Sequence, residues 1–202
     1  PEVDCVVLAA GFSRRMGLDK LALDLGGTTV LERTLQNVLR SGVNETIVVI
    51  NPEATDLEAR LSKYNLKLIV NHRSSQGIST SVQAGLSSVA ATSQGVIFAL
   101  GDQPLIPARV YNSLLDSYRS GLQLALYPTY RRRRGNPVLF DRRTWPMLME
   151  LEGDKGGSQL FASLPASELC AVEMDIPEVL VDLDTPGDYE NISDIFKPEG
   201  DS

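Results

Sequence analysis

Short, continuous apolar runs alternate with helix-like patterns along most of this 202-residue chain. The runs are VDCVVLAA, TIVVI, LKLIV, GVIFAL and LQLALY, and helical patterns separate them at residues 31–39, 57–64, 78–86 and 110–118. Strands that are apolar on both faces are typical of a parallel sheet covered by helices on both sides. The alternation therefore predicts an α/β fold of three layers with a mostly parallel central sheet.

Composition and charge narrow the function classes. With 43% apolar and 22% charged residues, and no apolar run long enough to cross a bilayer, we expect one domain over residues 1–202 and no membrane partner. No basic or apolar leader precedes the first run, so we expect a cytoplasmic protein. The net charge of −7 argues against nucleic acid as a partner. Cys5 and Cys170 lie in apolar runs, which predicts free, buried thiols rather than a disulfide or a metal pair.

A glycine turn with several cations follows the first apolar run, in the stretch LAAGFSRRMGLDK. Small residues at positions 9–11 let the backbone approach a ligand closely, and Arg14, Arg15 and Lys20 supply positive charge. Neither the GxxxxGK[ST] pattern of a Walker loop nor the GxGxxG pattern of a dinucleotide site is present. The stretch predicts a seat for a nucleoside triphosphate; the alternative is an ordinary turn with solvated basic residues.

The same stretch resembles the signature LAAGxSxRMGxxK of nucleotidyltransferases that attach a nucleotide to the molybdenum cofactor. It is more loosely similar to sugar-nucleotide pyrophosphorylases and to the cytidylyltransferases of isoprenoid synthesis. The resemblance implies a Rossmann-like nucleotidyltransferase fold, with a nucleotide-binding half over about residues 1–105 and an acceptor-binding half over about 106–202. Relatives that transfer a guanylyl group usually read LAGG, so Ala10 favours CTP over GTP. The implied nucleotide contacts are Leu8, Ala9, Ala10, Gly11, Arg15, Lys20, Ser81 and Gly85, the last two from the segment QGISTSVQAGL.

Two acidic segments are candidates for a metal site. Asp102 follows the run GVIFAL, at the carboxyl end of a predicted strand where open parallel sheets bind ligands. Asp182 and Asp184 alternate in VDLDTPGDY, so a strand there would place both on one face. GDQP resembles the family's GDxP and DLDTPGDY its D-x-D-T-P-x-D, which implies that Asp102 and Asp184 hold Mg²⁺. The alternative for each is capping of the helix that follows it.

The later part of the chain carries two segments that resemble the family's pterin side. RRRRGNPVLF is similar to a G-H-P-V segment, with Asn136 where relatives commonly carry His, and EGDKGG is similar to G-D-x-G-G/A. For residues 131–134, all arginine, two interpretations stay open: they attract the acceptor's phosphate, or they form a solvated loop. The implied acceptor contacts are Gly135, Asn136, Pro137, Gly153 and Asp154.

The sequence shows no obvious nucleophile or general base, and its single histidine, His72, has no partner set for zinc or for a triad. An acceptor that is itself a phosphate monoester needs no base, so catalysis reduces to positioning and charge neutralisation. We therefore expect Arg15, Lys20 and Asp102 to catalyse transfer of CMP from CTP to the terminal phosphate of molybdopterin, with Mg²⁺, releasing pyrophosphate. The alternatives are a cytidylyltransferase for a sugar or polyol phosphate, a GTP-using guanylyltransferase, and a non-catalytic module that delivers cofactor to a molybdoenzyme or chaperone partner.

Overall fold

A computed structural model describes residues 1–11, 20–121 and 123–197 of the chain. Its first four strands are parallel and lie in the order β3-β2-β1-β4. The pairing starts at Val3 opposite Gly95 and runs through Leu8 opposite Leu100, so the carboxyl ends of β1 and β4 lie side by side. These strands are β1 (Val3–Ala9), β2 (Thr46–Ile50), β3 (Lys67–Val70) and β4 (Gly95–Leu100).

The second half of the sheet departs from simple parallel order. β7 (Val138–Asp141) lies between β4 and β5 (Ala125–Tyr130) and is antiparallel to both. β8 (Leu169–Glu173) pairs parallel with β5. β6 (Arg133–Arg134) is antiparallel to the last two residues of β5 and forms a hairpin with them. The sheet is thus mostly parallel, as expected, with β7 as an antiparallel insertion that the alternation of runs and helices did not predict.

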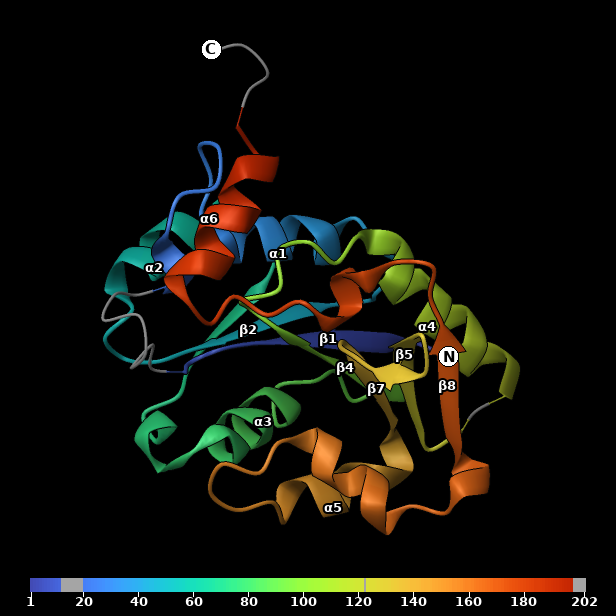
Figure 1. Ribbon diagram of the computed structural model, residues 1–202. Coiled ribbons are helices and arrows are strands. Elements are labelled where there is room, and N and C mark those ends of the chain that lie inside the picture. The colour runs from blue at the N-terminus through green and yellow to red at the C-terminus, as the bar shows by residue number, and fades with distance from the viewer. Residues whose placement is uncertain (12–19, 122, 198–202) are drawn as a thin grey trace.

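Helices cover both faces of this sheet, which confirms the predicted three layers (Figure 1). The upper face in Figure 1 carries α1 (Val30–Leu39), α2 (Thr55–Leu61), α4 (Ala108–Gly121) and α6 (Pro186–Ile195). The lower face carries α3 (Ile78–Leu86) and α5 (Trp145–Met149). Short 3₁₀ turns fill the connections at Lys20–Ala22, Ser74–Gln76, Arg142–Thr144, Gly157–Ser163, Ala166–Glu168 and Pro177–Leu180.

Helix α1 shows how local sequence fixes an element of this fold. Thr29 and Glu32 form a capping box, each side chain accepting a hydrogen bond from the other's backbone N–H. Leu31, Leu35 and Val38 are fully buried, as their spacing predicts. The chain enters α1 through a tight turn across Gly26 and Gly27, closed by a hydrogen bond from Leu25 N–H to the Thr28 carbonyl.

Both cysteines are free thiols, as expected. Cys5 is fully buried, and its burial followed by the nearby Asp4 charge raises the pKa of the thiol far above its usual range. Cys170 is only half-buried, because β8 lies at an edge of the sheet. Within the described ranges, none of the helices is both long and apolar enough to cross a membrane.

Candidate active site

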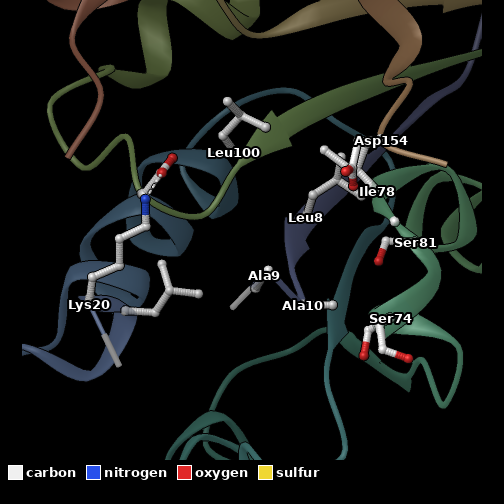
Figure 2. Close-up of a pocket in the computed structure, with 14 residues that line it drawn as sticks. Leu8, Ala9, Ala10, Lys20, Ser74, Ile78, Ser81, Leu100 and Asp154 are labelled. Atoms are coloured by element: carbon white, nitrogen blue, oxygen red, sulfur yellow. Dashed lines mark hydrogen bonds and ion pairs between the residues drawn. The ribbon is translucent and has the colours of Figure 1, made fainter. Parts of the chain in front are cut away.

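A cavity of about 580 Å³ lies at the carboxyl ends of β1 and β4 (Figure 2). Its volume is within the range of about 300–1,000 Å³ that is typical of small-molecule sites. Figure 2 shows the end of β1 between Lys20 on one side and the start of α3 on the other. The lining residues are Leu8, Ala9, Ala10, Gly11, Lys20, Leu21, Ser74, Ser75, Gly77, Ile78, Ser81, Leu100, Asp102 and Asp154.

The cavity brings together most of the residues that the sequence assigned to a nucleotide. The end of β1 contributes Leu8, Ala9, Ala10 and Gly11, and Ser81 joins them from α3 across some seventy residues of sequence. Arg14 and Arg15 lie outside the described residues. The sequence did not single out Leu21, Ser74, Ser75, Ile78 and Leu100 as lining residues.

Lys20 lies between two carboxylates at one end of the cavity. Its Nζ is 2.6 Å from Asp102 Oδ2 and 3.1 Å from Asp184 Oδ1, and it donates a further hydrogen bond of 2.9 Å to the Leu183 carbonyl. Burial lowers the pKa of this ammonium, but the two carboxylates outweigh burial and raise it above its usual value. Lys20 therefore stays protonated and supplies a fixed positive charge to the site.

The capping alternatives for both aspartates are wrong. The helix after Asp102 begins only at Ala108, and the helix after Asp184 is capped by Thr185, whose side chain accepts from Asp188 N–H. Both carboxylates instead face Lys20. The fold thus brings together two residues that are far apart along the chain, and their predicted role as metal ligands stays a prediction.

The cluster fits a divalent cation. Asp102 Oδ1 is buried and has no hydrogen-bond partner among the described residues. Asp102 Oδ2 and Asp184 Oδ1 both accept hydrogen bonds from the Lys20 ammonium. Mg²⁺ typically binds one or two carboxylates and takes its other ligands from phosphates and water. In the described part of the chain no group of three or more acidic, histidine or cysteine side chains could hold a metal. A pair of carboxylates completed by a ligand's phosphates is therefore the arrangement that these residues support.

Residues 181–184 do not form the predicted strand, so that prediction is wrong. They form an irregular segment near the carboxyl end of β4. Leu183 is buried, and its N–H donates a hydrogen bond of 3.3 Å to the Asp102 carbonyl. Asp182 turns to Gln103 and accepts a short hydrogen bond from its Nε2, while Asp184 turns to Lys20. Burial, followed by the nearby Asp102 charge, raises the pKa of Asp182 above its usual value. Asp182 is thus adjacent to the cluster and bonded to Gln103.

The segment EGDKGG, residues 152–157, contacts the start of α3. Ser79 N–H donates to the Gly153 carbonyl at 3.1 Å, so this donor in the first turn of α3 already has a partner. Gly77 permits this contact: its φ is +115°, and a Cβ there would lie 2.3 Å from the Gly153 carbonyl oxygen. Asp154, predicted to contact the acceptor, lines the cavity beside Ile78 (Figure 2). Gly153 places Asp154 there through its backbone rather than lining the cavity itself.

Gly85 does not line the cavity. It lies where α3 packs on β1, and a Cβ at this position would be 2.3 Å from Val6 Cγ1 and 3.2 Å from Val49 Cγ2. The structure therefore gives Gly85 a packing role, because only a glycine allows this close approach of helix and sheet. Its contact with a nucleobase, implied by resemblance, stays a prediction.

The segment GNPV leads into β7, next to β4, and does not line the cavity. Asn136 N–H donates 3.0 Å to the Val179 carbonyl, and the Asn136–Pro137 bond is cis. Gly135 is packed so closely that a Cβ would lie 2.2 Å from the Val179 carbonyl oxygen. Val138 pairs with Phe98 near the carboxyl end of β4. Gly135, Asn136 and Pro137 therefore lie at the same end of β4 as Asp102, which follows this strand. Their contact with an acceptor stays a prediction.

The four arginines form an ordered hairpin. Arg131 and Arg132 occupy a two-residue turn between β5 and β6 with φ of +49° and +65°, where Asn-Gly is the usual choice. Arg131 N–H donates to Glu173 Oε1 at 2.9 Å, and the Arg134 guanidinium lies 4.5 Å from the centroid of the Phe161 ring. The side chains are exposed at the carboxyl end of β5, and both interpretations of their role remain open.

Comparison with known proteins places this geometry in a family. The model of the MobA-like NTP transferase domain matches residues 5–169. The chain is 27% identical over 188 residues to the molybdenum cofactor cytidylyltransferase of Escherichia coli, covering 93% of each chain. It is 30% identical over 167 residues to nicotine blue oxidoreductase of Paenarthrobacter nicotinovorans, covering 80% of this chain and 81% of that protein.

A solved structure agrees with this assignment. The structure of Rv0371c from Mycobacterium tuberculosis in complex with manganese superposes with a TM-score of 0.81 at 25% identity, covering 96% of this chain and 99% of that one. The matched range, residues 5–169, includes the end of β1, Lys20 and Asp102, whereas Asp184 lies beyond it. The chain belongs to the family of the MobA-like NTP transferase domain and is a nucleotidyltransferase of that family.

Proposed function

We propose that this protein transfers CMP from CTP to the terminal phosphate of molybdopterin, in a reaction that requires Mg²⁺ and releases pyrophosphate. The observation that carries the proposal is the cluster in which Lys20 lies between Asp102 and Asp184 at the edge of the cavity. The 27% identical relative from Escherichia coli is a molybdenum cofactor cytidylyltransferase, and this chain covers 93% of it.

The reaction is a displacement at the α-phosphorus of CTP. An oxygen of the acceptor phosphate forms the new P–O bond, the bond between the α-phosphorus and the bridging oxygen breaks, and pyrophosphate leaves with that electron pair. The attacking oxygen is already anionic at neutral pH, so no side chain has to remove a proton. What the protein must supply is position and compensating charge.

Different residues of this chain supply position and compensating charge. The backbone of Ala9 and Ala10 forms the floor on which the nucleotide lies, and Lys20 neutralises charge on the α-phosphate. Arg15, in the same motif, is assigned to the β- and γ-phosphates. Asp102 and Asp184 would hold Mg²⁺, which supplies Lewis-acid polarisation of the phosphates when bound.

The nucleotide preference and the acceptor rest on different parts of the chain. Ala10 is 3% exposed and lines the cavity, so its methyl group occupies space that a glycine would leave to a purine. Asp154 lines the cavity at the opposite side from Lys20, which is consistent with an acceptor that enters past the start of α3 (Figure 2).

The test is pyrophosphate release from purified protein with Mg²⁺ and each of the four nucleoside triphosphates, with and without molybdopterin. We expect release only with CTP and molybdopterin together, and a product containing cytidine and pterin by mass spectrometry. Lys20→Ala should lower the rate by at least about 100-fold, as expected for loss of a charged group that stabilises the transition state. Lys67→Ala, which removes an exposed lysine paired with Glu45, is the matched control and should keep the wild-type rate.

A panel of acceptors separates the alternatives. Release with a sugar or polyol phosphate but not with molybdopterin would replace the acceptor, and preference for GTP would replace the nucleotide. No release with any combination, while CTP still binds, would favour the non-catalytic delivery module.

A further inference from the structure

Three buried polar side chains lie directly behind the cavity wall. Asn71, Thr80 and Ser81 are 4%, 6% and 4% exposed, and none of them is charged. Asn71 Nδ2 donates to Thr80 Oγ1 at 2.8 Å and to Ser81 Oγ at 2.9 Å. Only Ser81 of the three also lines the cavity.

The backbone fixes which way the Asn71 amide points. Arg73 N–H donates to Asn71 Oδ1 at 3.0 Å. A backbone N–H can only donate, so the oxygen of the amide must face Arg73 and the NH₂ group must face the two hydroxyls. Both hydrogens of that NH₂ group are therefore used, one on Thr80 and one on Ser81.

The two hydroxyls differ in where their own protons go. Thr80 Oγ1 lies 2.8 Å from the Gly77 carbonyl and 3.0 Å from the Arg73 carbonyl, so its proton is used inside the protein. Ser81 Oγ accepts from Asn71, and among the described residues no acceptor takes its proton. Figure 2 shows the Ser81 oxygen turned toward the cavity, on the side of Ala10.

We propose that Asn71 is a positioning residue that makes Ser81 a hydrogen-bond donor toward the ligand. Because Asn71 occupies a lone pair of Ser81 Oγ, the hydroxyl proton is left to point into the cavity. The cavity wall beside Ala10 therefore selects a nucleobase edge that presents an acceptor there, such as O2 or N3 of cytosine. This inference rests on the proposed function, in that it names how the same site reads its nucleotide.

Binding measurements by calorimetry at fixed Mg²⁺ test the inference without turnover. The probes are CTP and inorganic tripolyphosphate, because tripolyphosphate occupies the phosphate end and has no base. We expect Ser81→Ala and Asn71→Asp each to weaken CTP about 10- to 100-fold while leaving tripolyphosphate within twofold. Asn71→Asp is nearly isosteric but turns the donor into an acceptor, which draws the Ser81 proton away from the cavity.

The double variant adds a second criterion. Once Asn71→Asp has redirected the Ser81 proton, Ser81→Ala should cost little more, so the two effects on CTP should not multiply. Thr80→Ser, which keeps the hydroxyl, and Asn112→Asp, which alters a half-buried asparagine that accepts from Gly42 N–H, are the matched controls and should keep wild-type affinity. If Asn71→Asp does not fold, Asn71→Ser replaces it, and about a fivefold loss of CTP affinity is expected.

The outcomes separate this inference from the proposed function. If the wild-type protein binds CTP but Ser81→Ala and the Asn71 variant keep its affinity within twofold, the donor assignment is overturned. Equal losses for CTP and tripolyphosphate would overturn it too, because the effect would then not be on the base. Absence of CTP binding to the wild-type protein would overturn the proposed function itself, whatever the variants do.

Discussion

Gly85→Ala distinguishes a packing glycine from a nucleotide-binding one. The added Cβ would lie 2.3 Å from Val6 Cγ1, more than 1 Å short of an ordinary carbon contact of about 3.5–4.0 Å. Val6 is fully buried in β1 and cannot rotate away into free space. Overpacking of this kind costs about 1–3 kcal/mol, and a contact this short belongs at the upper end.

Helix propensity works in the opposite direction. Alanine is favoured over glycine by about 1 kcal/mol inside a helix, so the expected net loss is about 2 kcal/mol of unfolding free energy. For a protein of this size each kcal/mol shifts Tm by about 2–4 °C, which gives a decrease of about 4–8 °C. Gly187→Ala in α6 is the matched control: the nearest atom to its Cβ would be Thr185 Oγ1 at 3.8 Å, so Tm should stay or rise.

The assay pairs thermal unfolding with CTP binding. We expect a lower Tm for Gly85→Ala and a Kd for CTP within about threefold of wild type. Val6→Ala removes the clashing methyl group. The double variant should therefore lose less unfolding free energy than the sum of the losses of the two single variants, by about 1 kcal/mol or more. An unchanged Tm together with a large loss of CTP affinity would refute the packing role and support the contact implied by the family motif.

Three further perturbations test other parts of the structure. Burial would raise the pKa of Glu32, but hydrogen bonds from Lys63 and Thr29 lower it to about 2. The ionised Glu32 carboxylate therefore stabilises the fold fully above pH 4.5, and this stabilisation is lost as the pH falls toward 2. The stability difference between wild type and Glu32→Gln, from urea unfolding, should therefore shrink by about 2 kcal/mol between pH 7 and pH 3; a constant difference would contradict this. Replacing Arg131 and Arg132 with Asn-Gly should raise stability by about 1–2 kcal/mol by relieving two positive φ angles, and a higher KM for the acceptor alone would show that the arginines bind it, whereas an unchanged KM would favour a solvated turn. Ala10→Gly should shift the ratio of kcat/KM toward GTP, and an unchanged ratio would remove Ala10 from the account of base selection.

Local pattern was enough to predict most elements within residues 1–105. The helical patterns at residues 31–39 and 78–86 correspond to α1 and α3, which the structure shows at those positions. Each depends on neighbours within one or two turns, where burial and hydrogen bonding follow from spacing. The insertion of β7 between β4 and β5 could not be predicted this way, because strand order depends on pairing between distant segments.

The segment from 181 to 184 shows why alternation alone misleads. Apolar and acidic residues alternate there as in a half-buried strand, yet no strand forms in this segment. Val179 and Leu183 are both fully buried and anchor the segment, while Leu183 N–H is used on the Asp102 carbonyl rather than in a ladder. The pattern correctly indicated that Leu183 is buried, whereas Val181 is only half-buried and the expected backbone pairing does not form.

The candidate site shows the same division between residue identity and residue partnership. Motifs identified Lys20, Asp102 and Asp184 separately, but only the fold shows that one ammonium holds both carboxylates, within 2.6 and 3.1 Å. Two carboxylates so close to a common point repel each other unless a cation lies between them, and the Lys20 ammonium supplies that cation here. Asn71 extends this argument, because an asparagine after a strand has the sequence signature of a turn residue. The bond from Arg73 N–H to Asn71 Oδ1 is the local turn contact that this signature predicts, whereas the bond from Asn71 to Ser81 depends on how the helix that begins seven residues later packs beside the turn.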